Sequence, residues 1–119
     1  MLVAISSKVY SDLSTFSGLT ALLDNGVKGV RPLIAEEKDG DAFVTYFVRY
    51  QGTESKDNAI QFQLITESWA KKYDDSLAIA DQVTAALGVS TEQYRQVSGT
   101  PKYTEENIIY TEQIFNILK

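Results

Sequence analysis

The chain contains no cysteine and no histidine. Without cysteine it can form no disulfide, offers no thiol nucleophile and has no thiolate ligand for a metal. Without histidine it lacks the imidazole that activates most Ser and Cys nucleophiles and that most often binds zinc. We therefore expect a protein that is not an enzyme and that holds no cofactor.

Basic residues are also few, with eleven Lys and Arg against sixteen Asp and Glu and a formal net charge of -5. Nucleic-acid binding depends on clustered Lys and Arg that neutralise phosphates. The only adjacent basic pair is Lys71-Lys72, which is typical of a solvated helix start. The surface as a whole is not expected to bind nucleic acid.

Long apolar runs are missing as well. The apolar start at Met1–Ile5 is interrupted by Ser6, Ser7 and Lys8, before it reaches the length of a signal peptide core. No run approaches the roughly 20 apolar residues that span a bilayer. We expect no membrane contact and synthesis in the cytoplasm. At 119 residues, with 44% hydrophobic and 23% charged content, the chain is expected to form one domain, residues 1–119.

Acidic residues cluster at one glycine, and this cluster supports the one enzymatic alternative, a carboxylate centre with a hard cation. The spacing does not match a calcium-binding loop of the EF-hand type, so a solvated turn is the preferred interpretation. The residues are Glu36, Glu37, Asp39 and Asp41, around Gly40.

The stretch from residue 43 to residue 88 predicts two strands followed by a helix. Residues 43–50 are rich in β-branched and aromatic side chains, and residues 60–65 alternate between apolar and polar. Trp69 is assigned to the core by default. The helix would run from Tyr73 to Leu87 and end at Gly88 as a left-handed cap. Its apolar stripe is predicted to comprise Tyr73, Leu77, Ala80, Val83 and Leu87, widened by Ile79 and Ala86.

The strand at residues 43–50 has apolar side chains on both of its faces. It is therefore either a central strand or one whose second face is covered by another subunit. We single out Phe43, Phe47 and Arg49 as candidate residues for contact with another copy or a partner, together with Glu54 and Lys56 in the polar loop that follows.

The remaining segments complete an α+β pattern. Residues 2–23 predict an amphipathic helix in two parts that ends at Asp24-Asn25-Gly26, and residues 27–34 predict a short edge strand. Residues 94–97 and 108–118 predict two more strands, separated by a turn at residues 98–101. The expected fold has two helices on one face of a mostly antiparallel, four- to five-stranded sheet, in the order αβββαββ.

This pattern resembles the tail completion or tail terminator proteins of long-tailed phages and prophages, a family formerly catalogued as a domain of unknown function. The resemblance covers most of the chain and is strongest in the helix at residues 73–87. It also includes Ile5, Val9, Leu13, Leu19 and Leu22 in the first helix, Arg31-Pro32, and the strands at residues 43–48 and 60–64.

The resemblance implies a structural protein of the virion tail that forms a ring, of six copies, at the head-proximal end. Such a ring stops growth of the tube and joins the head connector. The implied partners are copies of the chain itself, the tail tube protein and the head connector protein, with DNA passing through without specific binding. An acidic surface suits that passage because it repels phosphates.

Two alternatives remain open. One is a neighbouring class of virion part, a head-tail connector or a minor tail component. The other is a monomeric protein-interaction module that binds a partner through the face bearing Phe43, Phe47 and Arg49.

Overall fold

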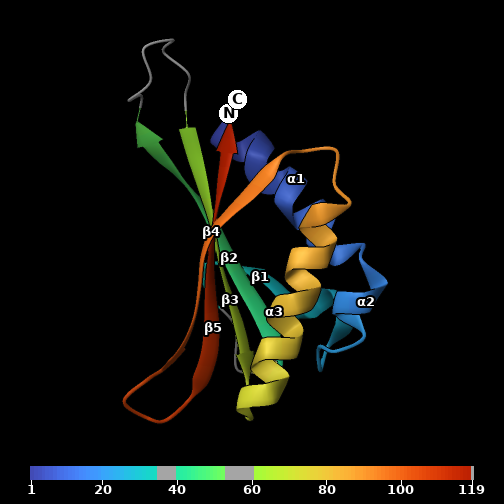
Figure 1. Ribbon diagram of the computed structural model, residues 1–119. Helices are drawn as coiled ribbons and strands as arrows, with labels where there is room; N and C mark the ends of the chain where they lie inside the picture. The colour runs from blue at the N-terminus through green and yellow to red at the C-terminus, as the bar shows by residue number, and fades with distance from the viewer. Residues whose placement is uncertain (35–39, 53–60, 119) are drawn as a thin grey trace.

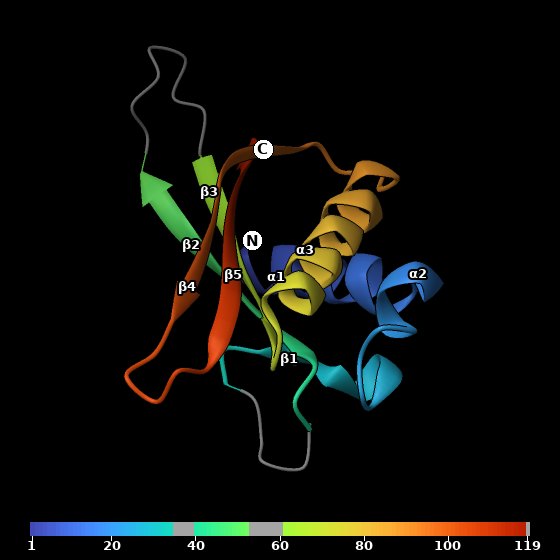
Figure 2. The same ribbon diagram turned by 60° about the horizontal axis from the view of Figure 1, so that its bottom comes forward.

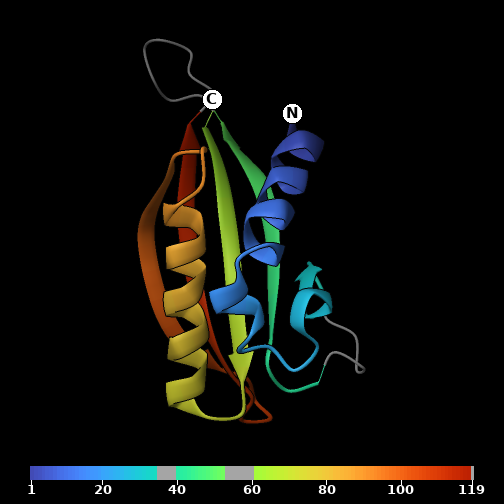
Figure 3. The ribbon, with the colours of Figure 1, turned by 90° about the vertical axis from the view of Figure 1, so that its right-hand side faces the viewer.

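The computed structural model describes residues 1–34, 40–52 and 61–118. Its five-stranded sheet carries the helices on one face (Figure 1 and Figure 2). Seen from the helix side, α3 (Tyr73–Gly88) lies over one half of the sheet and α1 (Leu2–Ser14) lies over the other half (Figure 3). This two-layer arrangement confirms the α+β class, because the amphipathic helices cover the apolar side of the strands.

The strands are ordered β1-β2-β3-β5-β4 across the sheet. β1 pairs with β2 in parallel, whereas β2 with β3, β3 with β5 and β5 with β4 are antiparallel. The sheet is therefore mixed, and the expectation of a mostly antiparallel sheet missed the parallel edge pair. The strands are β1 Val30–Pro32, β2 Phe43–Gly52, β3 Gln61–Ala70, β4 Tyr94–Tyr103 and β5 Ile109–Leu118.

The N-terminal helix has two parts, as predicted, α1 (Leu2–Ser14) and α2 (Ser17–Thr20). The predicted turn after it is confirmed at Gly26, whose φ of 56° is open to glycine without strain. The edge strand predicted at residues 27–34 is shorter in the structure. Its first part is the 3-10 turn η1 (Gly26–Gly29), and only β1 pairs with the sheet.

The third helix, α3 (Tyr73–Gly88), begins where the sequence predicted, and five of the seven residues of its predicted stripe are buried. Tyr73 is 52% exposed and Leu77 is only half-buried. The predicted stripe was therefore wrong at these two positions. Hydrogen bonds that direct Ser76 toward the sheet explain the difference. The Ser76 hydroxyl donates to the Ser68 carbonyl at 2.8 Å and lies 2.7 Å from the Thr111 hydroxyl. The buried residues of α3 are Ser76, Ile79, Ala80, Val83, Ala86 and Leu87.

Two predicted boundaries are corrected. Gly88 is the last residue of α3 and has no positive φ, so it is not a left-handed cap. The turn predicted at residues 98–101 lies inside β4, which continues to Tyr103. Pro101 is tolerated there because β4 is an edge strand and needs no outward backbone donor. The register shifts between Gln96 and Ser98, which marks a bulge in the same edge.

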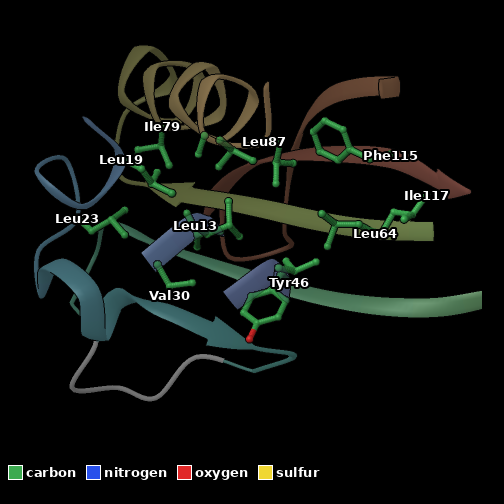
Figure 4. Close-up of a cluster of buried hydrophobic side chains, with 14 of the residues drawn as sticks. Leu13, Leu19, Leu23, Val30, Tyr46, Leu64, Ile79, Leu87, Phe115 and Ile117 are labelled. Carbon is green, nitrogen blue, oxygen red and sulfur yellow. The ribbon is translucent and has the colours of Figure 1, made fainter. Parts of the chain in front are cut away.

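The core lies between the helices and one face of the sheet (Figure 4). Leu13 of α1 and Leu64 of β3 have no exposed surface, and Phe115 of β5 is 2% exposed. Asp12 ties α1 to the start of β4: its carboxylate accepts hydrogen bonds from Ser90 Oγ at 2.6 Å and from the Tyr94 hydroxyl at 2.9 Å. Burial, aided by this carboxylate, raises the pKa of Tyr94 well above its usual range.

Candidate assembly surface

The sheet face turned away from the helices carries no other element of the described chain (Figure 1 and Figure 2). Side chains alternate between the faces of a strand, and the register places those of the four longer strands in rows. We call this surface the open face. Its members are Phe43, Thr45, Phe47 and Arg49 of β2; Gln63, Ile65, Glu67 and Trp69 of β3; Tyr110, Glu112, Ile114 and Asn116 of β5; and Arg95, Ser98, Thr100 and Lys102 of β4.

The first row of the open face is aromatic. Phe43 stacks on Trp69 with ring centroids 5.7 Å apart, and Trp69 stacks on Tyr110 at 4.4 Å. The indole Nε1 of Trp69 donates to the Thr45 hydroxyl at 3.1 Å, which fixes the ring in place. Such stacked pairs contribute about 0.5–1.5 kcal/mol beyond their burial. The row therefore forms a rigid stack of aromatic rings across three strands.

The second row is acidic. Glu67 and Glu112 face each other across β3 and β5. Glu67 accepts a hydrogen bond from the Thr45 hydroxyl at 3.1 Å. Glu112 pairs with Lys102 at 3.0 Å, and this hydrogen bond raises the pKa of the Lys102 ammonium. Glu67 is paired with no cation among the described residues, so the row keeps an uncompensated negative charge.

The third row is apolar and the fourth is basic. Phe47, Ile65 and Ile114 lie side by side in the third row, and Ile65 is only 4% exposed. In the fourth row, Arg49 Nε donates to Gln63 Oε1 at 2.9 Å, and Gln63 Nε2 donates to Asn116 Oδ1 at 3.1 Å. Arg95 faces Asn116 from β4 and is exposed. The row is the basic row of the open face, and its polar groups are already ordered by one another.

Three of the predicted contact residues, Phe43, Phe47 and Arg49, lie on the open face, in its first, third and fourth rows. Glu54 and Lys56 lie outside the described residues. The sequence interpretation missed Trp69, which it assigned to the core, and the polar chain through Gln63. A signal was present, because Thr66 and Trp69 are residue types that favour strands, and a strand continued beyond residue 65 places Trp69 on the same face as Gln63 and Ile65.

In the part of the chain that the structure describes, no group of three or more acidic side chains could hold a metal ion. Glu36, Glu37 and Asp39 lie outside that part. Asp41 pairs with Lys71 at 3.2 Å, and its backbone N–H donates to Asp24 Oδ2 at 2.7 Å. The Asp41 carboxylate is therefore paired with a lysine, and the carboxylate that holds the turn is that of Asp24.

Two hollows flank the turn between β4 and β5. One, of about 460 Å³, is lined by Tyr73 and Tyr103. The other, of about 330 Å³, lies beside Phe43 and Trp69 and is bordered by Ile108. The walls of both hollows are mostly aromatic and aliphatic. The second adjoins the aromatic row, whereas the first lies on the helix side of the sheet, because Tyr73 belongs to α3. None of the described helices has the length and apolar content to cross a membrane.

Comparisons with known proteins place this architecture. No family model and no curated protein matches the chain. Among solved structures, a chain of the structure described as "Virion of native gene transfer agent (GTA) particle" matches with a TM-score of 0.77. The match covers 98% of this chain and 96% of that chain, at 14% sequence identity.

This chain shares its fold with a virion subunit. Because the match includes nearly the whole of both chains, the similarity extends to the complete order of helices and strands rather than to a common motif. At 14% identity it concerns the backbone arrangement, and it leaves the chemistry of each surface to be argued from this chain's own residues.

Proposed function

We infer that this protein is a structural subunit of a phage or phage-like virion. The observation that supports this most is the end-to-end match in fold to a chain of a gene transfer agent virion. The open face adds a physical reason. Aromatic, apolar and charged rows on a rigid sheet suit contact with another protein, whose interfaces join an apolar centre to a polar rim.

Within the virion, we assign the subunit to the tail terminator, which caps the tail tube and joins it to the head connector. This finer role is supported by the resemblance in sequence pattern through residues 5–22, 43–48 and 73–87. Its partners would be copies of itself in a ring of six, the tail tube protein and the head connector protein. The contact residues would include Phe43, Phe47 and Arg49, with Glu54 and Lys56 beside them.

The charge of the chain is compatible with that position. A net charge of -5 and the scattering of its basic residues would let DNA pass the ring without adhering to it. The protein would need no cofactor and would carry out no reaction, and it would be found in the virion tail after synthesis in the bacterial cytoplasm.

A head-tail connector or minor tail component is the second candidate. The same observation favours it, since the matched chain is identified only as part of a virion. The two roles differ in what is left when the subunit is missing: a terminator leaves tails that are overlong or not joined to heads, whereas a connector leaves heads that lose their DNA.

Deletion of the gene from its phage or prophage, followed by electron microscopy of the particles, tests the proposal. We expect filled heads beside unjoined or overlong tails. Complementation with Phe47→Asp should fail, and complementation with Asp81→Arg, on the exposed side of α3, should succeed. Normal joined virions in the deletion strain would overturn the proposal and favour the monomeric interaction module.

A further inference from the structure

The rows of the open face are arranged so that the face is complementary to itself. The apolar row of Phe47, Ile65 and Ile114 lies in the middle. The acidic row with Glu67 lies one row to one side, and the basic row with Arg49 lies one row to the other. Opposite charges at equal distances from an apolar line are what a surface needs to bind a copy of itself through a two-fold axis.

We propose that the free subunit pairs face to face with a second copy through the open face, with the two-fold axis running across the strands along the apolar row. This rotation keeps each strand opposite its counterpart and reverses its direction. Each apolar row then packs on the apolar row of the other copy, and each acidic row faces the basic row of the other copy.

The position of Arg49 fits this arrangement in detail. Its guanidinium does not extend straight from β2 but lies over β3, because Nε donates to Gln63 at 2.9 Å. Gln63 is two residues from Ile65 on one side, and Glu67 is two residues from it on the other. The rotation about Ile65 therefore brings the Arg49 guanidinium opposite Glu67 of the second copy, a carboxylate with no ion-pair partner among the described residues.

The area that the rotation brings together suits a weak, reversible pair. The acidic, apolar and basic rows, about 6.8 Å apart on four strands about 4.8 Å apart, cover on the order of 400 Å². Two such faces bury roughly 800 Å², which is the size of weak and transient protein contacts. Two twisted sheets can pack face to face when their strand directions lie within about 30° of each other.

The edges of the sheet are less suitable for pairing between copies. β1 has three residues, and β4 is interrupted by the bulge at Gln96/Ser98 and by Pro101. Bulges and prolines of this kind hinder the addition of a further strand. The inference goes beyond the proposed function, because a closed pair differs from a ring contact and would have to separate before the open face could meet neighbours in a virion.

A charge exchange tests the pairing in the full-length protein. Sedimentation velocity and light scattering over a dilution series at low salt should give a dimer that dissociates on dilution. Arg49→Glu alone, or Glu67→Arg alone, should raise the dissociation constant at least about tenfold, because each places like charges opposite one another. The double variant Arg49→Glu/Glu67→Arg should restore the dimer, and the control Asp81→Arg should leave it unchanged.

A second measurement does not depend on charge. Since the chain has no cysteine, a single one can be introduced without background. Ser98 faces Ile114 in the central row, so the two copies of Ser98→Cys should lie close together across the axis. A short bis-maleimide should join them into a covalent dimer, whereas Ala78→Cys on the exposed side of α3 should remain monomeric.

Several results would overturn the pairing. They are a monomeric mass at every concentration, a dimer that neither charge reversal weakens, a double variant that folds but does not recover the dimer, and equal cross-linking of the two cysteine variants. If a charge variant fails to fold by circular dichroism, the Ser98→Cys result decides, because that substitution hardly changes the size of the side chain. A virion role found by gene deletion is unaffected by any of these results.

Discussion

The two faces of the sheet use the same strands for different purposes. Leu64 and Ile65 are consecutive in β3, and both are nearly inaccessible, at 0% and 4% exposure. Leu64 is covered by the helices, whereas Ile65 is shielded by its own row, with Phe47 opposite on β2 and Ile114 opposite on β5. The first burial depends on the layers of the fold, and the second depends on neighbouring side chains of one surface.

The polar side chains of the two faces also differ in what holds them in place. On the covered face, hydroxyls are buried and mostly paired, as Ser76 is with Thr111. The Ser68 hydroxyl is the exception among the described residues, since it is buried without a partner. On the open face, Arg49, Gln63 and Asn116 are ordered by one another at the surface. A surface whose side chains are already ordered loses less entropy when it binds.

The largest effect should come from placing a charge on the covered face. Val83 has no exposed surface, so Val83→Asp buries an unpaired carboxylate and should lower the free energy of unfolding by about 4 kcal/mol or more. Urea unfolding followed by circular dichroism measures this loss. Leu77→Asp should cost less, because Leu77 is only half-buried.

The matched change on the open face is Phe47→Asp. Phe47 is half-buried and borders solvent, so the carboxylate remains hydrated and the loss should stay below about 2 kcal/mol. If both variants unfold at the same urea concentration, the two faces contribute equally to stability, and the open face is part of the core rather than a surface for assembly.

A subtler contrast comes from two neighbours in β3. Leu64→Ala should lower the free energy of unfolding by about 2–5 kcal/mol, because it leaves a cavity between layers that cannot collapse. Ile65→Ala should cost roughly 1–2 kcal/mol, since water and the flanking side chains can fill the space. Thermal melts of the dilute protein, where copies are separated, provide the comparison. A larger loss of stability for Ile65→Ala than for Leu64→Ala would contradict this prediction.

The sequence predicted the helices and strands more reliably than the way in which they pair and pack. The β-branched and aromatic content of residues 43–50 identified β2, the alternation in residues 60–65 identified β3, and the helical spacing identified α1 and α3. It could not reveal that β1 runs parallel to β2, because strand direction depends on the path of the intervening chain. It also misjudged α3, because the pattern counted apolar residues and could not anticipate that Ser76 would be buried against Ser68 and Thr111.

The open face was predicted only in part for a similar reason. Phe43, Phe47 and Arg49 stood out because they share one side of a strongly apolar strand. Trp69 did not, because the pattern was followed only to residue 65 and an isolated tryptophan is more often core. The rows across strands depend on register, which places Trp69 opposite both Phe43 and Tyr110. Register is a property of the folded sheet and not of any single segment.

Alkaline pH should lower the free energy of unfolding through two tyrosines on the helix-covered side of the sheet. Burial raises the pKa of Tyr46, and burial together with Asp12 raises that of Tyr94. Between the unfolded value, about 10, and the higher folded values, the folded state keeps protons that the unfolded state loses. Stability contributed by these groups is therefore complete below about pH 10 and falls as the pH rises further.

Urea unfolding between pH 8 and pH 11 measures this decline. Tyr94 is partly open to water, so its share should stay below the limit of about 1.4 kcal/mol per pH unit for one proton. Tyr94→Phe should flatten the slope above pH 10 while Tyr103→Phe, at an exposed tyrosine, should not. An unchanged slope in Tyr94→Phe would show that this hydroxyl does not couple folding to pH.

The smallest effect should be optical and should report on the open face alone. Trp69 is the only tryptophan of the chain and lies in the aromatic row, half-buried between Phe43 and Tyr110. The rotation about Ile65 places Gln61 of the second copy opposite Trp69, at the margin of the paired area. Pairing should therefore remove part of the water from the indole and move its emission to shorter wavelength by a few nanometres at high concentration. Arg49→Glu should keep the emission of the dilute protein at all concentrations. Asp81→Arg, on the far side of the molecule, should follow the parent. A spectrum that does not change with concentration in the parent would mean that nothing covers the aromatic row in solution.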